Sequence, residues 1–158
     1  MELRDYPAGK TAFYSFDSSV DPRAIILLVH GLGEHAGRYA GWAERFNKTG
    51  VTLRSFDLPG HGRTEGRWGV VPSPEKVYDT IDALLVGIGH DFPGLPLFLY
   101  GHSLGGGIVL NYLIRRKPEV TGAIVTSPWV ILSESPPALK LLMVNVAGKL
   151  MPGMTKPS

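Results

Sequence analysis

The sequence predicts an α/β fold built on a mostly parallel, doubly wound sheet. Short apolar runs alternate along its 158 residues with segments in which apolar residues recur at helical spacing. The run at residues 24–30 is hydrophobic along nearly its whole length, as expected for a central parallel strand that is buried on both faces. Each connection between successive runs is long enough for a crossover, which favours a parallel sheet with helices on its faces.

Taken in order, the chain predicts an edge strand at residues 11–16 and the central strand at 24–30. A helix follows, because Tyr39, Trp42, Ala43 and Phe46 share one face. The next strand is expected at residues 51–57.

Ser73 as N-cap and Pro74 at the first helical position start a second predicted helix. The residues expected on its buried face are Val77, Ile81, Leu84, Leu85 and Ile88. A strand beginning at Leu97, a helix that ends before Pro118 and a last strand at residues 120–126 complete the pattern.

Composition excludes several classes of protein. The net charge is +2 and no basic stripe is present, so nucleic acid is not an expected partner. The chain has no cysteine, which rules out disulfides, a thiol nucleophile and thiolate metal sites. The first residues lack the apolar segment of a signal peptide, and no apolar run is long enough to span a bilayer. We therefore expect a soluble, cytoplasmic protein, and nothing in the sequence implies a metal or an organic cofactor.

The segment most typical of a catalytic site is the turn at residues 101–105, after the strand that begins at Leu97. An apolar run leads into Gly-His-Ser-Leu-Gly at residues 101–105, and an amphipathic segment follows. A strand that reverses into a helix at G-x-S-x-G forms a nucleophile elbow, with the serine hydroxyl at the carboxyl end of the sheet. Gly101 and Gly105 leave room where the strand and the helix approach each other. Ser103 is the candidate nucleophile, and the Leu104 N–H is positioned to bind an oxyanion.

Two further glycine-rich loops are expected at the same end of the sheet. They follow the strands that end near His30 and Asp57, and ligands of doubly wound sheets bind beyond the carboxyl ends of the strands. Together the three loops read HGLGEHAGRY at residues 30–39, GHGRTEG at 60–66 and GHSLGG at 101–106. The chain therefore resembles the monoglyceride lipase and lysophospholipase branch of the α/β-hydrolase family, from about residue 24 to its end.

The resemblance implies roles for particular residues. Ser103 would accept the acyl group, and the N–H groups of Leu32 and Leu104 would form the oxyanion hole. Glu34 and Arg38 would lie near the polar, glycerol end of the substrate. Residues 1–132 would form the N-terminal part of the hydrolase core and residues 133–158 the start of a helical cap, within which the chain ends. Thr64 replaces the serine more usual in the second motif, and either hydroxyl can bond the nearby backbone.

The catalytic triad is the main departure from the family. Its order is Ser, then Asp, then His, but no Asp or His follows Ser103. Of the five histidines, His30 is expected to be buried and hydrogen-bonded, His35 and His61 to brace loops, His102 to point away from the serine, and His90 to lie at the far end of a helix. We therefore expect an incomplete sheet here, and a complementary C-terminal half, either separated by cleavage or missing by truncation, that supplies both residues.

The segment from Ala138 to Met151 is apolar on nearly all sides. It is either an ordinary buried helix or a lid, whose apolar face would cover an apolar pocket or rest on a lipid surface as a peripheral membrane contact. The predicted function is that of a serine hydrolase that cleaves a lipid ester, a monoacylglycerol or a lysophospholipid, through an acyl-enzyme on Ser103. The alternatives are an acyltransferase and a non-catalytic binding or interaction module.

Overall fold

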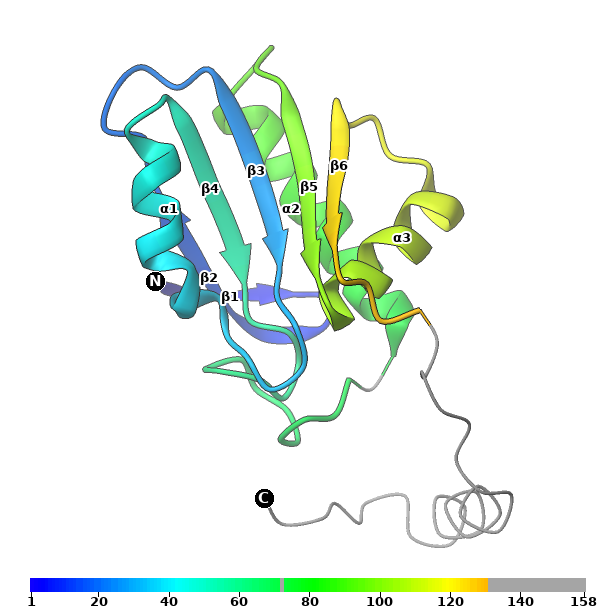
Figure 1. The fold of residues 1–158 in the computed structure, drawn as a ribbon. Helices are drawn as coiled ribbons and strands as arrows, with labels where there is room; N and C mark the ends of the chain where they lie inside the picture. Colours follow the sequence, from blue (N-terminus) through cyan, green and yellow to red (C-terminus); the bar gives the residue numbers. More distant parts are fainter. Residues whose placement is uncertain (72, 131–158) are drawn as a thin grey trace, which may run out of the picture.

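The computed structural model describes residues 1–71 and 73–130, which form one six-stranded sheet with helices on both faces (Figure 1). The strands lie in the order β1-β2-β4-β3-β5-β6. Neighbours from β4 to β6 pair in parallel, whereas β1 with β2 and β2 with β4 pair antiparallel. The elements, in chain order, are β1 (Glu2–Tyr6), β2 (Gly9–Phe16), β3 (Ala24–Val29), the 3-10 helix η1 (Ala36–Tyr39), α1 (Ala40–Asn47), β4 (Val51–Phe56), α2 (Pro74–Asp91), β5 (Leu97–His102), α3 (Leu104–Arg116) and β6 (Gly122–Thr126). The predicted α/β class with a mostly parallel sheet is confirmed.

Each face of the sheet packs against its own helices. Because side chains alternate along a strand, Ile25, Leu27 and Val29 of β3 face one way and Ile26 and Leu28 the other. The first three pack with the apolar faces of α2 and α3, and the other two pack against α1. Both faces of β3 are therefore buried, as its continuous apolar run predicts.

The N-terminal side of the sheet differs from the prediction. Residues 11–16 were expected to form an edge strand, but β2 pairs with β4 on one side and with β1 on the other. The edge is β1, which the sequence pattern misses because four of its five residues are exposed and three are charged. A short, charged strand is a usual solution for the edge of a sheet, since it discourages pairing with other chains.

The helices follow their sequence signals. The Ser73 hydroxyl caps α2 by accepting a hydrogen bond from the Lys76 N–H at 3.4 Å, and Pro74 is the first helical residue. Val77, Ile81, Leu84 and Ile88 are buried and Leu85 is half-buried, so the predicted inner face is confirmed. No helix in the described ranges is both long and apolar enough to cross a bilayer.

The strands β3 to β6 all end at the same edge of the sheet (Figure 1). The loops after β3 and β4 and the turn after β5 lie together at this edge, as the sequence predicts. The boundary at residue 133 and the expected cap helix lie outside the described residues.

Candidate active site

Ser103 occupies a sharp turn between β5 and α3. Its backbone has φ 52° and ψ −116°, a conformation that non-glycine residues rarely adopt. Three backbone hydrogen bonds hold this turn. The Ser103 N–H donates to the Thr126 carbonyl at 3.0 Å, and the Ser103 carbonyl accepts from the N–H groups of Gly107 at 3.0 Å and Trp129 at 2.8 Å. The predicted elbow is therefore present, and β6 and the residues after it anchor it.

Gly101 and Gly105 are required by the close approach of the elbow to the sheet. A Cβ added at Gly101 would lie 2.5 Å from the Gly105 carbonyl oxygen. A Cβ at Gly105 would collide with the carbonyl oxygens of Val29 and His30 at the end of β3. Only residues without a side chain allow α3 to begin directly against the sheet.

The loop after β3 lies directly against the serine. A Cβ added at Gly31 would lie 3.3 Å from the Ser103 Cβ. The N–H groups of Leu32 and Leu104 donate to no protein acceptor in the described ranges 1–71 and 73–130. Leu104 is also the first residue of α3, where the helix dipole favours negative charge. Both N–H groups predicted for an oxyanion hole are thus without a protein acceptor in these ranges, as such a role requires.

Glu34 shapes this loop from within. Its Oε2 accepts hydrogen bonds from the Gly31 N–H at 3.1 Å and the Tyr39 hydroxyl at 2.9 Å, while Oε1 lies 3.2 Å from the Arg38 guanidinium. Burial alone would raise the pKa of Glu34, but these hydrogen bonds and the arginine together lower it below its usual value. Glu34 is therefore an ionised brace for the loop.

A groove of about 330 Å³ opens beside the loop on the α1 face of the sheet. It is lined by Glu34, Arg38, Tyr39, Trp42, Tyr100 and His102. Its walls combine a carboxylate and a guanidinium with the faces of aromatic rings. Such a groove suits a small ligand that carries several hydroxyl groups.

His30 links the loop after β3 to the loop after β4. Its Nε2 accepts from the Leu58 N–H at 2.9 Å, so Nδ1 carries the proton and donates to the Gly31 carbonyl at 2.8 Å. Burial lowers the pKa of His30 and keeps the ring neutral. The prediction of a buried, hydrogen-bonded histidine is confirmed, and both ring nitrogens are occupied by structural bonds.

Asp57, at the end of β4, is a fully buried carboxylate that joins three segments. Its Oδ1 accepts from the Ala36 N–H at 2.7 Å. Its Oδ2 accepts from the Arg63 N–H at 2.8 Å and the Tyr14 hydroxyl at 3.1 Å. Burial, followed by the negative charge of Asp57, raises the pKa of Tyr14 to about 12. Asp57 thereby fixes the loop after β3 against β2 and the loop after β4.

Thr64 supports the same junction. Its hydroxyl donates to the Asp57 carbonyl at 2.7 Å and accepts from the Ala12 N–H at 2.8 Å. The bond to nearby backbone that was expected of a hydroxyl at this position is present.

None of the other histidines forms a hydrogen bond with the Ser103 hydroxyl in the described residues. The His102 Nδ1 lies 3.0 Å from the Thr126 hydroxyl, so its ring is directed to β6. His61 is buried with Nδ1 3.0 Å from the Pro59 carbonyl, and His90 is exposed at the end of α2. His35 is exposed on the outer side of the loop after β3. Within the described part of the chain there is also no group of three side chains that could hold a metal ion.

Sequence reasoning missed several residues that build the site. Asp57 contacts Ala36 and Tyr14 across 21 and 43 positions of sequence. Thr126 contacts His102 across 24 positions, and local patterns carry no information about such pairs. Asp57 had one usable signal, because a charged residue directly after a buried strand points to the functional edge of the sheet.

The strand order, the crossing helices and the serine elbow define the chain as an α/β-hydrolase. It belongs to the family described as serine aminopeptidase, S33, whose sequence model matches residues 20–157.

Curated relatives support this assignment. The chain is 34% identical to the monoacylglycerol lipase of Mycolicibacterium smegmatis over 134 residues, covering 85% of this chain and 48% of the lipase. It is 33% identical to the monoglyceride lipase of Homo sapiens over 135 residues, covering 85% of this chain and 45% of that enzyme. The chain thus spans about half the length of these relatives.

Solved structures agree. The monoacylglycerol lipase of Paleococcus ferrophilus superposes with a TM-score of 0.75 at 34% identity, covering 98% of this chain and 54% of that chain. A soluble variant of the monoglyceride lipase of Saccharomyces cerevisiae, in complex with a substrate analogue, gives 0.78 at 26% identity, with coverages of 96% and 52%.

Proposed function

We propose that this chain is the nucleophile-bearing part of a carboxylic ester hydrolase that acts on monoacylglycerols or lysophospholipids. The observation that carries the proposal is the backbone of Ser103, which is held at φ 52° beside two N–H groups without protein acceptors in the described ranges. The relatives named monoglyceride lipase favour a lipid ester as the substrate.

In the proposed reaction the Ser103 Oγ attacks the ester carbonyl carbon and loses its proton to a histidine base. The N–H groups of Leu32 and Leu104 stabilise the oxyanion of the tetrahedral intermediate. The intermediate collapses, the bond to the alcohol oxygen breaks, and the histidine returns the proton to the leaving alcohol. A water molecule then hydrolyses the acyl-enzyme by the same steps and releases the fatty acid.

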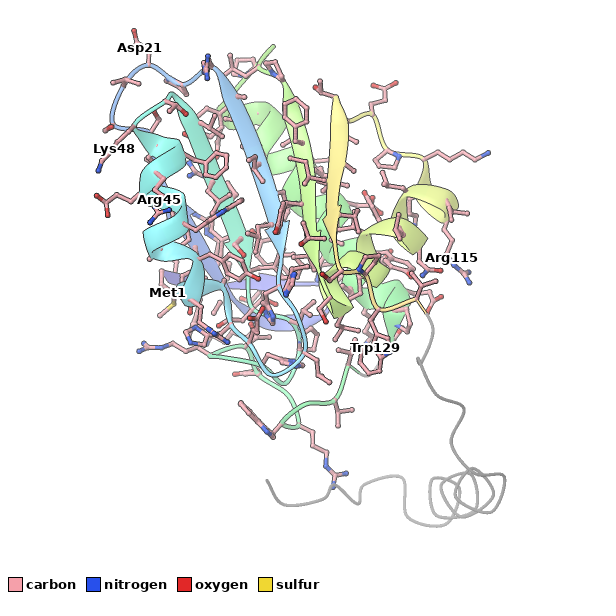
Figure 2. The ribbon with its side chains drawn as sticks, viewed as in Figure 1. Met1, Asp21, Arg45, Lys48, Arg115 and Trp129 are labelled. Carbon is pink, nitrogen blue, oxygen red and sulfur yellow. The ribbon has the colours of Figure 1, made fainter. Side chains whose placement is uncertain are left out.

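The base and the acid that orients it would come from a C-terminal segment, since no His or Asp follows Ser103. The outer edge of β6 supports this part of the proposal, because no strand among the described residues pairs with it. Ile124 on β6 is 47% exposed. Trp129 is 43% exposed (Figure 2), so apolar side chains are available for such a segment. The same contacts would extend the sheet and deliver the base.

Glu34 and Arg38 are proposed to contact the polar end of the substrate. They line the groove beside the oxyanion loop together with Tyr39 and His102. A carboxylate and a guanidinium can respectively accept from and donate to glycerol hydroxyls. Glu34 would serve both the loop and the substrate.

The test is to fuse residues 1–130 to the C-terminal half of the M. smegmatis monoacylglycerol lipase and to measure hydrolysis of a monoacylglycerol. The fusion should be active, and the isolated chain should lack turnover because its serine has no base. Ser103→Ala should reduce turnover at least about a thousandfold and abolish labelling by a fluorophosphonate. Leu32→Pro removes an oxyanion donor and should cost about a hundredfold, whereas Leu32→Ala should be mild.

Ser15→Ala is the matched control, because Ser15 is an exposed serine on β2 away from the elbow. Fluorophosphonate labelling of Ser103→Ala at a different serine would contradict the assignment of the nucleophile. A folded fusion that stays inactive while the parent lipase is active would favour the interaction-module alternative.

A further inference from the structure

The loop between β4 and α2 extends beyond the carboxyl edge of the sheet, next to the loop that follows β3 (Figure 1). Its residues 58–71 are named the 58–71 loop below. Trp68 belongs to this loop and is 64% exposed. A tryptophan that is this exposed on a structured loop is unusual, since burying an aromatic ring is favourable.

The backbone of the 58–71 loop is held in place under this tryptophan. On either side of Trp68, the Gly69 N–H donates to the Gly60 carbonyl at 2.8 Å and the Val70 N–H donates to the Arg67 carbonyl at 3.0 Å. The buried ring of His61 lies beneath the indole, with the two ring centroids 6.3 Å apart. The indole of Trp68 is therefore exposed to solvent while the backbone beneath it is held by hydrogen bonds.

Two arginines belong to the same loop as the indole. Arg63 and Arg67 are exposed, and neither forms an ion pair with any residue of the described ranges. Glu65 lies between them and partly offsets their charge. A cavity of about 630 Å³ lies between Trp68, Arg63 and Tyr14, which is space enough for a phosphate-bearing headgroup beside the indole.

An exposed indole and two exposed guanidinium groups on one loop match the interface of an anionic bilayer. Tryptophan prefers the headgroup level of a membrane, and arginine binds phosphate oxygens while it is attracted by the negative surface. Leu32, on the neighbouring loop at the same edge, is also 50% exposed. We propose that the 58–71 loop docks the protein on anionic phospholipid surfaces through Trp68, Arg63 and Arg67.

The position of the loop would bring the candidate active site close to the bilayer. The 58–71 loop and the Ser103 turn lie at the same edge of the sheet, so a bilayer that contacts the loop also faces the candidate active site. The use of this proximity for catalysis depends on the proposed lipid hydrolase, but the docking itself does not. Vesicle binding can be measured without turnover, so a failure of either proposal is seen separately.

The experiment uses the full 158-residue chain and sedimentation of vesicles made of phosphatidylcholine with phosphatidylglycerol. Arg63→Ala with Arg67→Ala should weaken binding about 25-fold at low salt, because each arginine near an anionic surface contributes about 1 kcal/mol. Glu65→Gln should strengthen binding by up to about fivefold for the same reason. The blue shift of tryptophan fluorescence on binding should be lost in Trp68→Phe, and added salt should weaken binding of the parent chain.

The matched control is Arg45→Ala with Arg115→Ala, which removes the same charge from exposed positions on α1 and α3 (Figure 2). It should bind within about twofold of the parent chain, because its arginines lie away from the docking loop. Equal weakening by the two double variants, or equal binding to pure phosphatidylcholine, would overturn the proposal. Loss of vesicle binding in the presence of soluble glycerol phosphate at constant ionic strength would identify a site for free phosphate and would also overturn it.

Discussion

Replacing Asp57 by alanine should destabilise the protein more than any exposed substitution, because one buried carboxylate serves three donors. The N–H groups of Ala36 and Arg63 and the hydroxyl of Tyr14 all point at it, at 2.7, 2.8 and 3.1 Å. These donors belong to η1, the loop after β4 and β2, so the carboxylate connects segments that are distant in sequence. Asp57→Ala removes every acceptor of this junction at once.

The size of the loss follows from the exposure of each donor. A hydrogen bond to an ionised group contributes about 1.5 to 3 kcal/mol, and an unsatisfied buried donor adds a penalty of its own. Ala36 is fully buried, whereas Arg63 is exposed and Tyr14 is half-buried, so water can replace the acceptor for the last two. We expect Asp57→Ala to lower the free energy of unfolding by about 3 to 4 kcal/mol. Asp57→Asn should cost about half of that, since its one oxygen can still accept from Ala36.

Urea unfolding followed by circular dichroism measures this loss, and hydrogen exchange locates it. The amide of Ala36 should lose protection in Asp57→Ala, while amides of β3 keep theirs apart from the global change. The pKa of Tyr14, raised to about 12 first by burial and then by Asp57, should fall toward its ordinary value of 10 in the alanine variant. The reasoning is refuted if Asp57→Ala costs less than about 1 kcal/mol, because water would then satisfy all three donors.

Two other perturbations test the same edge of the sheet. Gly105→Ala should prevent folding or lower the free energy of unfolding by more than about 3 kcal/mol, because its Cβ would collide with the Val29 carbonyl. The control is Gly87→Ala, at an exposed position of α2 where an added Cβ has nothing within 4 Å. In the same urea titration it should raise the free energy of unfolding by up to about 1 kcal/mol. Lowering the pH from about 7 to about 5 should destabilise the protein by up to about 2 kcal/mol, because an unfolded histidine takes up a proton near pH 6.5 while burial lowers the pKa of His30 in the folded state. The stability that His30 contributes is thus complete above about pH 6.5 and is lost as the pH falls toward the pKa of His30 in the folded state. An equal loss of stability between pH 7 and pH 5 in His30→Leu would contradict this origin. His90→Ala is the control, because His90 is exposed.

Sequence patterns predicted those parts of the fold that depend on local order. The buried strand β3 and the inner face of α2 have an unambiguous apolar pattern, and the elbow around Ser103 is a local motif. The edge strand β1 was missed because its residues are mostly charged and exposed, so it lacks the alternating apolar pattern by which a strand is predicted.

The candidate site was predicted only in part, for a related reason. Ser103 and the loop at Leu32 lie in short motifs, whereas Asp57 and Thr126 act through partners far along the chain. Whether a carboxylate at the end of a strand braces loops or binds a ligand depends on which donors surround it, and that arrangement exists only in the folded chain. Glu34 was expected only near the substrate. In the structure its carboxylate also accepts a hydrogen bond from the Gly31 N–H and so braces the loop that holds Leu32.

The backbone of Ser103 shows which part of the proposed catalysis this chain prepares by itself. A serine at φ 52° is strained by about 1 to 3 kcal/mol, and it persists only where surrounding contacts determine it. Those contacts are hydrogen bonds to Thr126, Gly107 and Trp129, and all three partners belong to the described chain. The strained turn at Ser103 is therefore held by contacts within the described part of the chain. A C-terminal segment that carries His and Asp would supply proton transfer to this serine.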